Sequence, residues 1–509
     1  MGEMKRYVIL PAFGFESPLL AQSPKLRAVG ATVKLAARHG ATRSSSGGVA
    51  GTKMRVLHST HENGPKLVEM TEEGELNLRA EVPGIKVIPL TFYRKMRVEH
   101  HVEHRLKRSA AAASVGMTVH VLNKKTSEPV AGARIVAFTN FEREEGAEAT
   151  SARSGAAKLK LTPGIAIDRL YVYGPMGYWG HYARGFKLKD GANFELSPID
   201  LEKDMSLLGR FASGLPVDGG KSVKVAVVDS GVARDHPGLP NATGGLNLVL
   251  DEIRNNPGAE SEWGPAKKDG EHGTHVAGII GAGPFGKVAV RGVSPGVELR
   301  SYRVFPNDGG DATNYDIMNA IDRAVLDGCD IINLSLGGGD EDEAVRAAVG
   351  KALDKGVVVV AAAGNDGRRS VAYPAALASC VAVSAMGARG SFPKESTEEL
   401  DAIKPFGDPD QDCFVAAFSN IGPQIDVIGP GVGVVSTVPE KGYAVMSGTS
   451  MACPAVAGIA AYLLASDPAI SKAKKSDRAK LLKDALYENC RTKGFGRDYE
   501  GFGYPRGKV

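Results

Sequence analysis

The sequence predicts an α/β fold whose C-terminal part is a doubly wound, mainly parallel sheet. Near-continuous apolar runs predict strands buried on both faces, at 223–231, 297–305, 329–338 and 356–365. Helical patterns lie between them, at 314–328 and 342–356, and both end in glycine, a common helix C-cap. Buried strands that alternate with helices are typical of a parallel sheet covered on both sides. Ligands then bind at the carboxyl ends of the strands.

Two smaller units are predicted before this C-terminal unit, which we place at 205–509. The first, residues 1–110, combines strand patterns with one helix candidate at 72–82 and is expected to be a small α+β domain. A hairpin is predicted over 54–71, where an Asn-Gly pair supplies the turn. The second unit, residues 115–200, has short alternating strands and no long helix, which predicts a small β-sandwich. Between the two units, residues 94–114 are expected to form a basic linker or a helix.

Composition is ordinary for a globular protein. The chain has 509 residues, 43% apolar and 24% charged, and a formal net charge of +4. The small charge gives no reason to expect a nucleic acid or membrane partner, and no run approaches the roughly 18 apolar residues of a spanning helix. The first residues form no clear signal peptide, so a cytoplasmic location is favoured, with secretion as the alternative.

Candidates for nucleophilic chemistry gather in the stretch SGTSMACPAVAG at 447–458. Ser450 lies at the start of an apolar helical pattern, where free N–H groups can stabilise a developing negative charge. Thr449 is expected to cap that helix, and Cys453 to be packed beneath it. A serine nucleophile needs a base and an orienting carboxylate. His272, before a predicted helix, and Asp229, at a strand end, meet that need in principle.

Four stretches of this sequence closely resemble the subtilisin-like serine proteases, the subtilases or peptidase family S8. They are VVDSGVARDHPGL, HGTHVAGIIGA, AAAGNDG and SGTSMACPAVAG, at 227–239, 272–282, 361–367 and 447–458. They stand in the order Asp, His, Ser that is typical of that family. The resemblance covers roughly residues 205–509 and implies a serine endopeptidase.

The resemblance also implies a role for each residue. Asp229 would orient His272, His272 would be the general base and acid, and Ser450 would form the acyl-enzyme. Asn365 and the backbone N–H of Ser450 would form the oxyanion hole.

Further positions match the family's substrate-binding strand and the pocket for the residue before the scissile bond. They are Ser335, Leu336, Gly337, Ala362, Ala363, Gly364 and Ala372. An extended peptide would add a strand at this edge. The methyl group of Ala372 at the base of the pocket suggests room for a medium or large apolar side chain.

The first unit resembles the inhibitory propeptide of the same family, over 66–89. The resemblance implies a self-processing or latent zymogen in which the pro-region binds the catalytic domain in cis, with its tail near 90–98. A latent enzyme would need a second protease, for which the linker 94–108 is the natural cut site. The second unit resembles carboxypeptidase-regulatory-like or immunoglobulin-like modules over 118–139. It could be a spacer, a docking module or part of the pro-region.

Three questions stay open at this point. No cofactor and no metal-binding residue is predicted, and calcium is possible only at an unidentified site, because the loop 281–292 lacks the side-chain oxygens that a hard cation requires. An insertion at 388–414 could be a surface loop, a binding loop or a local ion site. The alternative function is an inactive protease-fold scaffold in which the β-sandwich is the binding module.

Overall fold

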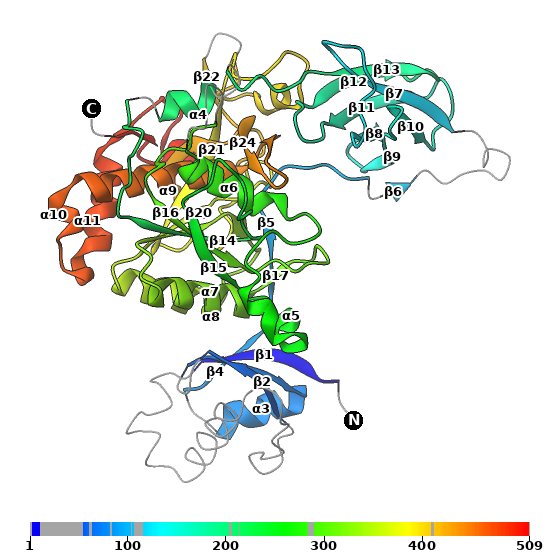
Figure 1. The fold of residues 1–509 in the computed structure, drawn as a ribbon. Helices are drawn as coiled ribbons and strands as arrows, with labels where there is room; N and C mark the ends of the chain where they lie inside the picture. Colours follow the sequence, from blue (N-terminus) through cyan, green and yellow to red (C-terminus); the bar gives the residue numbers. More distant parts are fainter. Residues whose placement is uncertain are drawn as a thin grey trace.

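The computed structural model places three bodies along the chain (Figure 1). It describes residues 3–10, 54–60, 64–81, 84–102, 104–105, 116–202, 206–212, 214–283, 290–408 and 412–507. The turn expected at Asn63 and the middle of the loop 281–292 therefore lie outside the described residues.

The largest sheet of the described chain has eight strands, and its neighbours are parallel except where β22 pairs with β21. Its order is β15 (Ala242–Asn247), β16 (Glu298–Arg303), β14 (Lys224–Asp229), β18 (Ile331–Leu334), β20 (Val358–Ala362), β21 (Cys380–Ala388) and β22 (Cys413–Val415), with β23 (Val427–Pro430) also parallel to β21. The prediction of a doubly wound, mainly parallel sheet is confirmed.

Helices cover both faces of this sheet, because its strands are apolar on both sides. In β14, Val225 and Val227 join the core beneath one helical layer, and Ala226 and Val228 join the core beneath the other. The first layer contains α6 (Glu271–Gly281), α9 (Thr449–Ser466) and α11 (Lys475–Glu488), and the second contains α7 (Asn314–Leu326) and α8 (Glu343–Asp354).

Helix α9 is the one described helix that is long and apolar enough to cross a membrane. However, 83% of its 18-residue apolar window is buried inside the protein. It contacts α6 and the strands β18, β20, β21 and β23. Its composition is therefore that of a core helix.

The remaining elements of the C-terminal unit are short. They are α4 (Ser206–Phe211), α5 (Leu250–Asn255), α10 (Pro468–Ser471), α12 (Arg497–Glu500), the 3₁₀ helices Pro257–Ser261 and Thr397–Asp401, and the hairpins β24 (Val434–Val438) with β25 (Gly442–Met446) and β26 (Cys490–Arg491) with β27 (Tyr504–Pro505).

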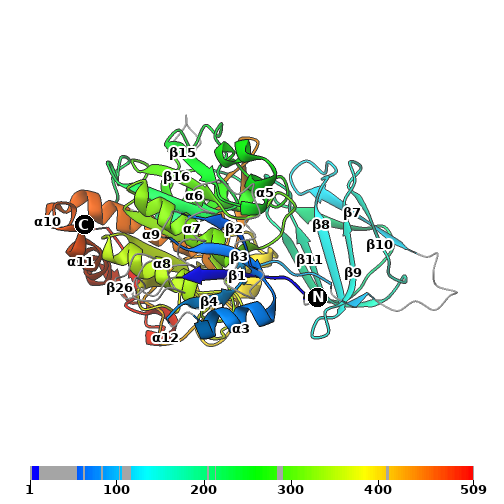
Figure 2. The same ribbon diagram turned by 90° about the horizontal axis from the view of Figure 1, so that it is seen from below.

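The N-terminal body is an antiparallel sheet with one helix. This agrees with the hairpin predicted over 54–71 and the helix predicted over 72–82. Its order is β2 (Arg55–Ser59), β3 (Lys66–Met70), β1 (Lys5–Leu10) and β4 (Lys86–Pro89), with α3 (Glu72–Glu81) beside it. One face packs on Leu78 of α3. The other face, through Val8 and Leu67, joins the core that includes α7 and α8. Figure 2 shows the sheet lying across these two helices.

A single strand connects this sheet to the rest of the protein. Strand β5 (Phe92–Lys95) lies between β17 (Ala312–Thr313) and β19 (Leu336–Gly337) and pairs antiparallel with both. Beyond it the described residues have no helix up to β6 (His104–Arg105), which pairs with the next body. The helix alternative for 94–114 is therefore wrong over its described part.

The third body is a two-layer β structure. One sheet has the order β10 (Ala156–Leu159), β7 (Met117–Asn123) and β13 (Ala192–Leu196), and the other has the order β12 (His181–Lys187), β11 (Ala166–Tyr173), β8 (Arg134–Asn140), β9 (Glu145–Thr150) and β6. Apolar side chains of both sheets, such as Val119 and Leu170, share one core.

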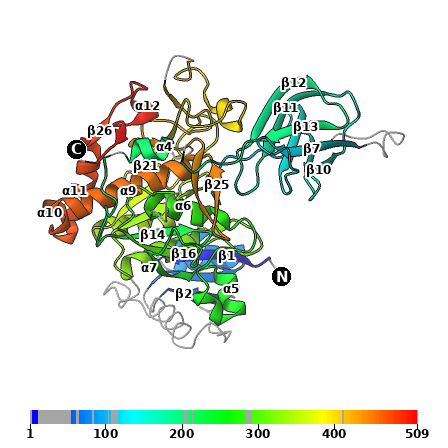
Figure 3. The ribbon, with the colours of Figure 1, turned by 45° about the horizontal axis from the view of Figure 1, so that its top comes forward.

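The 388–414 insertion lies against this third body (Figure 3). The N–H of Tyr182 donates to the carbonyl of Glu395 at 2.8 Å, and Leu400 packs with the aromatic side chains of β8 and β11. Trp179 is fully buried in the core of the C-terminal unit. The third body is thus fixed to the large sheet by packing as well as by the chain.

One buried ion pair closes the end of β16, next to Asp229 in the sheet register. The guanidinium of Arg303 is 2.7 Å from Oε2 of Glu252 and also donates to the carbonyl of Phe305. Burial of a guanidinium is tolerated only when its charge and its N–H groups have partners.

We expect Glu252→Ala to lower the free energy of unfolding by about 3 kcal/mol, because it leaves the charge of Arg303 buried and unpaired. The measurement is denaturant unfolding of the full chain in a Ser450→Ala background. Glu260→Ala, which removes an exposed carboxylate nearby, is the control and should change the midpoint little. An equal effect of both substitutions would contradict the assignment.

Candidate active site

The predicted catalytic residues meet where strand ends face helix starts. Asp229 is the last residue of β14, and His272 is the second residue of α6. Ser450 is the second residue of α9, and Asn365 follows β20 by three positions. The parallel topology places these ends on one edge of the sheet, as the strand pattern predicted.

Asp229 and His272 form a buried pair. Nδ1 of His272 lies 2.8 Å from Oδ1 and 3.0 Å from Oδ2 of Asp229, and neither side chain is exposed. The N–H of Ser230 also donates to Oδ1 at 2.6 Å, which fixes the carboxylate. With Nδ1 directed at a carboxylate, Nε2 is the nitrogen that can accept a proton. Nε2 is buried and has no hydrogen-bond partner among the described residues.

Ser450 is held at the start of α9 by the neighbouring strand. Its hydroxyl donates to the carbonyl of Ser335 at 2.9 Å, and the hydroxyl of Ser335 donates to the carbonyl of Ser450 at the same distance. The N–H of Ser450 donates to the carbonyl of Met96 at 3.1 Å. The carbonyl of Met96, in the segment 92–96 that follows the N-terminal sheet, thus occupies the place where an oxyanion would be stabilised.

Asn365 is oriented by a contact that sequence reasoning missed. The N–H and the hydroxyl of Thr449 both donate to Oδ1 of Asn365 at 2.9 Å. The amide nitrogen Nδ2 is therefore left free to donate, and it is buried without a partner among the described residues. The expectation that Thr449 caps α9 is wrong, because Gly448 is the N-cap residue and Thr449 holds the amide instead.

Gly448 allows the close approach of the segment. Its φ is +152°, and a Cβ atom there would lie 2.4 Å from the carbonyl oxygen of Met96 and 3.2 Å from Nδ2 of Asn365. Any side chain would therefore obstruct the carbonyl and the amide donor at once.

The other nucleophile candidates in 447–458 have different contacts. The hydroxyl of Ser447 accepts from the N–H of Gly433 at 2.9 Å. Cys453 is fully buried, its Sγ is 3.1 Å from Oδ1 of Asn333, and burial raises the pKa of its thiol well above the usual range. A thiol that stays protonated is a poor nucleophile. Ser450 is thus the candidate that faces the segment.

Residues predicted to bind substrate lie along β5. In β19, Leu336 pairs with Lys95 of β5 and Gly337 pairs with Arg94 of β5. The N–H of Met96 donates to the carbonyl of Ser335 at 3.3 Å. The segment 92–96 therefore adds a strand at this edge, as a bound peptide would.

The side chain of Met96 fills an apolar pocket and is only 2% exposed. Its Cε lies 2.3 Å from the position that a Cβ on Gly337 would occupy, and Cβ of Ala372 lies 3.5 Å from the same position. Ala362 belongs to the same core as Met96, whereas Ala363 lies in the core on the other face of the sheet.

Gly364 supports the pocket through its backbone. Its N–H donates to the hydroxyl of Thr449 at 3.1 Å, and its φ is +109°. A Cβ there would lie 2.3 Å from Nδ2 of Asn420.

His275, one turn after His272, has a structural role. Its Nε2 lies 3.0 Å from the carbonyl of Val434 and 3.1 Å from that of Ala444. Burial lowers the pKa of His275 to about 3. The ring is neutral and holds β24 and β25 against α6.

The described residues identify no metal site. Among them, no group of three or more His, Cys, Asp and Glu side chains is arranged to hold a metal ion. The loop 281–292 carries no carboxylate or amide side chain in its sequence, so its residues do not fit side-chain ligation of calcium.

Comparison with known proteins identifies the family of the C-terminal unit. Residues 220–504 match the model of the Subtilase family. The chain is 37% identical over 263 residues to subtilisin amylosacchariticus of Bacillus subtilis subsp. amylosacchariticus, a match that covers 51% of this chain and 60% of that protein. It is 36% identical to the subtilisin of Bacillus pumilus over 51% of this chain and 82% of that protein. It is 38% identical to subtilisin BL of Lederbergia lenta over 50% of this chain and 80% of that protein. The chain belongs to the subtilase family.

Proposed function

We propose that this chain is a serine endopeptidase made as a zymogen, and that it cleaves its own bond between Met96 and Arg97. The observation that carries the proposal is the hydrogen bond from the N–H of Ser450 to the carbonyl of Met96. Strand β5 reaches this point in the antiparallel register of a bound peptide. The buried Asp229–His272 pair lies at the neighbouring helix start.

The chemistry proceeds through an acyl-enzyme. For the reaction, the hydroxyl of Ser450 has to leave the carbonyl of Ser335 and reach Nε2 of His272, which takes the proton as Oγ attacks the carbonyl carbon of Met96. The negative charge on the carbonyl oxygen is stabilised by the N–H of Ser450 and Nδ2 of Asn365. His272 then protonates the amine of Arg97, and water releases the acyl group by the reverse sequence.

Residues on both sides of the bond support this assignment. Lys95 Nζ donates to the carbonyl of Asp269 at 2.8 Å, and Arg97 pairs with Glu271. Asp269 and Glu271 lie within the three residues before His272 in the chain. The segment therefore passes between Ser450 on one side and the start of α6 on the other.

The residues before Met96 would act as the pro-region in cis. Their sheet packs on α7 and α8, and β5 fills the edge where a peptide substrate would bind. Until the pro-region is released, other protein or peptide substrates are excluded. The alternative of an inactive scaffold is not favoured, because the buried Asp229–His272 pair and the hydrogen bond from the N–H of Ser450 to the carbonyl of Met96 support an active enzyme.

Refolding the full chain and its Ser450→Ala variant tests the proposal. We expect the wild type to yield a fragment that begins at Arg97, and Ser450→Ala to remain intact, because no other group can replace the nucleophile. Gel electrophoresis and N-terminal sequencing provide the measurement. An intact wild-type chain that also fails to react with a fluorophosphonate, even after proteolysis of the linker, would refute the function.

We expect Asn365→Ala to slow the cleavage about 10²- to 10³-fold, because one of two oxyanion donors is lost. The first-order rate of fragment formation after refolding is the measurement. Asn420→Ala, which removes a neighbouring amide that bonds to Asp366 and not to the segment, is the matched control. A comparable loss in both would point to a folding defect.

We expect Met96→Asp to slow the same cleavage at least about 100-fold, because a carboxylate would have to enter an apolar pocket. Met96→Leu, which preserves size and apolarity, should be cleaved within a few-fold of the wild-type rate. Equal rates for the two variants would show that this pocket does not select the residue before the scissile bond.

A further inference from the structure

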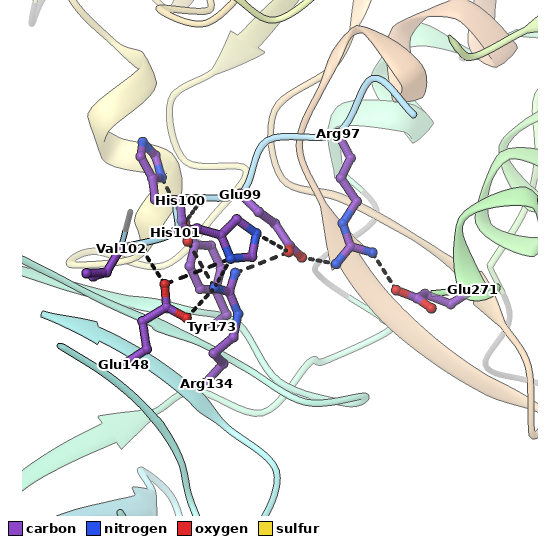
Figure 4. A network of polar contacts seen from close by, with 9 residues as sticks. All are labelled: Arg97, Glu99, His100, His101, Val102, Arg134, Glu148, Tyr173 and Glu271. Carbon is purple, nitrogen blue, oxygen red and sulfur yellow. Dashed lines mark hydrogen bonds and ion pairs between the residues drawn. The ribbon is translucent and has the colours of Figure 1, made fainter. Parts of the chain in front are cut away.

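Residues 97–102, the segment that follows the proposed scissile bond, leave the C-terminal unit almost at once. The N–H of Val98 donates to the carbonyl of Ser447 at 2.9 Å. Arg97 pairs with Glu271 and also with Glu99 of its own segment. From Glu99 to Val102 the hydrogen bonds and ion pairs of the segment are mainly with the β-sandwich (Figure 4).

The sandwich binds the backbone of this segment. The N–H of His100 donates to the hydroxyl of Tyr173 at 2.9 Å, and Arg134 donates to the carbonyl of His100 at 2.9 Å. The N–H of Val102 donates to the carboxylate of Glu148. Three polar backbone groups within residues 100–102 thus bind side chains of β8, β9 and β11. Contacts of this kind do not depend on the sequence of the segment.

An aromatic pocket receives the ring of His100. The ring is stacked on Tyr171, with centroids 4.2 Å apart and planes at 18°. Phe141 is 5.6 Å away between centroids, and the hydroxyl of Tyr173 lies 2.8 Å from Nδ1 of His100. A planar side chain is the shape that such a pocket selects.

Charges align the segment with the sandwich. Arg134 lies 3.1 Å from Oε2 of Glu99 and 3.7 Å from Oε2 of Glu148. Arg134 therefore connects a carboxylate of the segment with a carboxylate of the sandwich, while Arg97 connects the segment with the start of α6. These pairs join the sandwich to the helix that carries His272.

A cavity lies beside the segment, between the sandwich and the catalytic unit. A cavity of about 1270 Å³ follows the segment and is lined by Arg97, His100, Tyr171 and Tyr173 together with Glu271 and Asn365. The sandwich is held at a fixed place by buried Trp179 and by the 388–414 insertion. It therefore continues the substrate cleft beyond the large sheet.

We propose that the β-sandwich carries a subsite for the polypeptide that follows the scissile bond, in which Tyr173, Arg134 and Glu148 bind backbone groups and the pocket at Tyr171 selects a planar side chain at the fourth position. The inference rests on the proposed function, because it counts positions from the bond between Met96 and Arg97. Tyr173 and Arg134 are positioning residues, which hold the segment so that the carbonyl of Met96 stays at Ser450.

The experiment compares self-cleavage of refolded full-length variants by a timed acid quench. We expect His100→Ala and Tyr173→Phe each to lower the first-order rate roughly 3- to 10-fold, the effect of losing one or two hydrogen bonds or a stacked ring. The double variant should lose less than the product of the two single effects, because both changes remove the contact between Nδ1 of His100 and the hydroxyl of Tyr173. His100→Phe, which restores a planar ring, should recover most of the rate.

His120→Ala is the matched control, because it removes a histidine from the other sheet of the same sandwich. It should remain within twofold of the wild type. Thermal unfolding in the Ser450→Ala background shows whether each variant is folded. We expect His100→Ala to fold, because His100 belongs to the segment and not to the core of the sandwich. Wild-type rates for both His100→Ala and Tyr173→Phe would overturn the subsite.

A second readout separates this inference from the proposed function. After complete processing, hydrolysis of a short chromogenic peptide that has no residue beyond the scissile bond reports on the catalytic residues alone. A wild type that neither processes itself nor hydrolyses this peptide would refute the protease. If the wild type does both, and His100→Ala and Tyr173→Phe process themselves at the wild-type rate, the protease assignment stands and the subsite is refuted.

Discussion

The arrangement of the whole molecule depends on the pairing of β5 with β17 and β19. This short strand is the only described stretch of chain that links the N-terminal sheet to the later bodies, and it forms a three-stranded sheet with β17 and β19. Its register places the carbonyl of Met96 at the N–H of Ser450. The N-terminal sheet must then lie near α7 and α8, and the sandwich must lie beyond the other end of the cleft.

The arrangement of the candidate active site follows from a more general constraint. Parallel strands end on the same edge, and the helices that follow them begin there with free N–H groups. Asp229 and His272 are buried together because one ends β14 and the other begins α6. Most buried polar groups have a partner, and Oδ1 of Asn365 has two, the N–H and the hydroxyl of Thr449. Nδ2 of Asn365 and Nε2 of His272 are exceptions among the described residues.

Much of the fold and most of the candidate site could be predicted from the sequence, for physical reasons. Buried strands and glycine-capped helices leave a strong pattern, and the residues at Asp229, His272, Asn365 and Ser450 lie in local motifs. Thr449 was misinterpreted because a threonine before a helix is also typical of an N-cap.

Contacts between distant segments could not be predicted in the same way. Arg134, Glu148 and Tyr173 lie on three strands, and their relation to Glu99 and His100 appears only when the sandwich folds beside the linker. The insertion 388–414 contains no motif that indicates its packing against Tyr182. A single sequence shows the residue types there, whereas their neighbours are determined by the tertiary structure.

The position of Met96 has a thermodynamic consequence. While the chain is continuous, β5 is tethered at both ends, and its effective concentration at the cleft does not depend on how dilute the protein is. A cut after Met96 turns one molecule into two and creates a carboxylate at the end of β5, beside the donors of Ser450 and Asn365. Occupancy of the cleft then obeys a dissociation constant, so the fraction of free enzyme rises on dilution. Latency would change from a property of the fold to a property of the concentration.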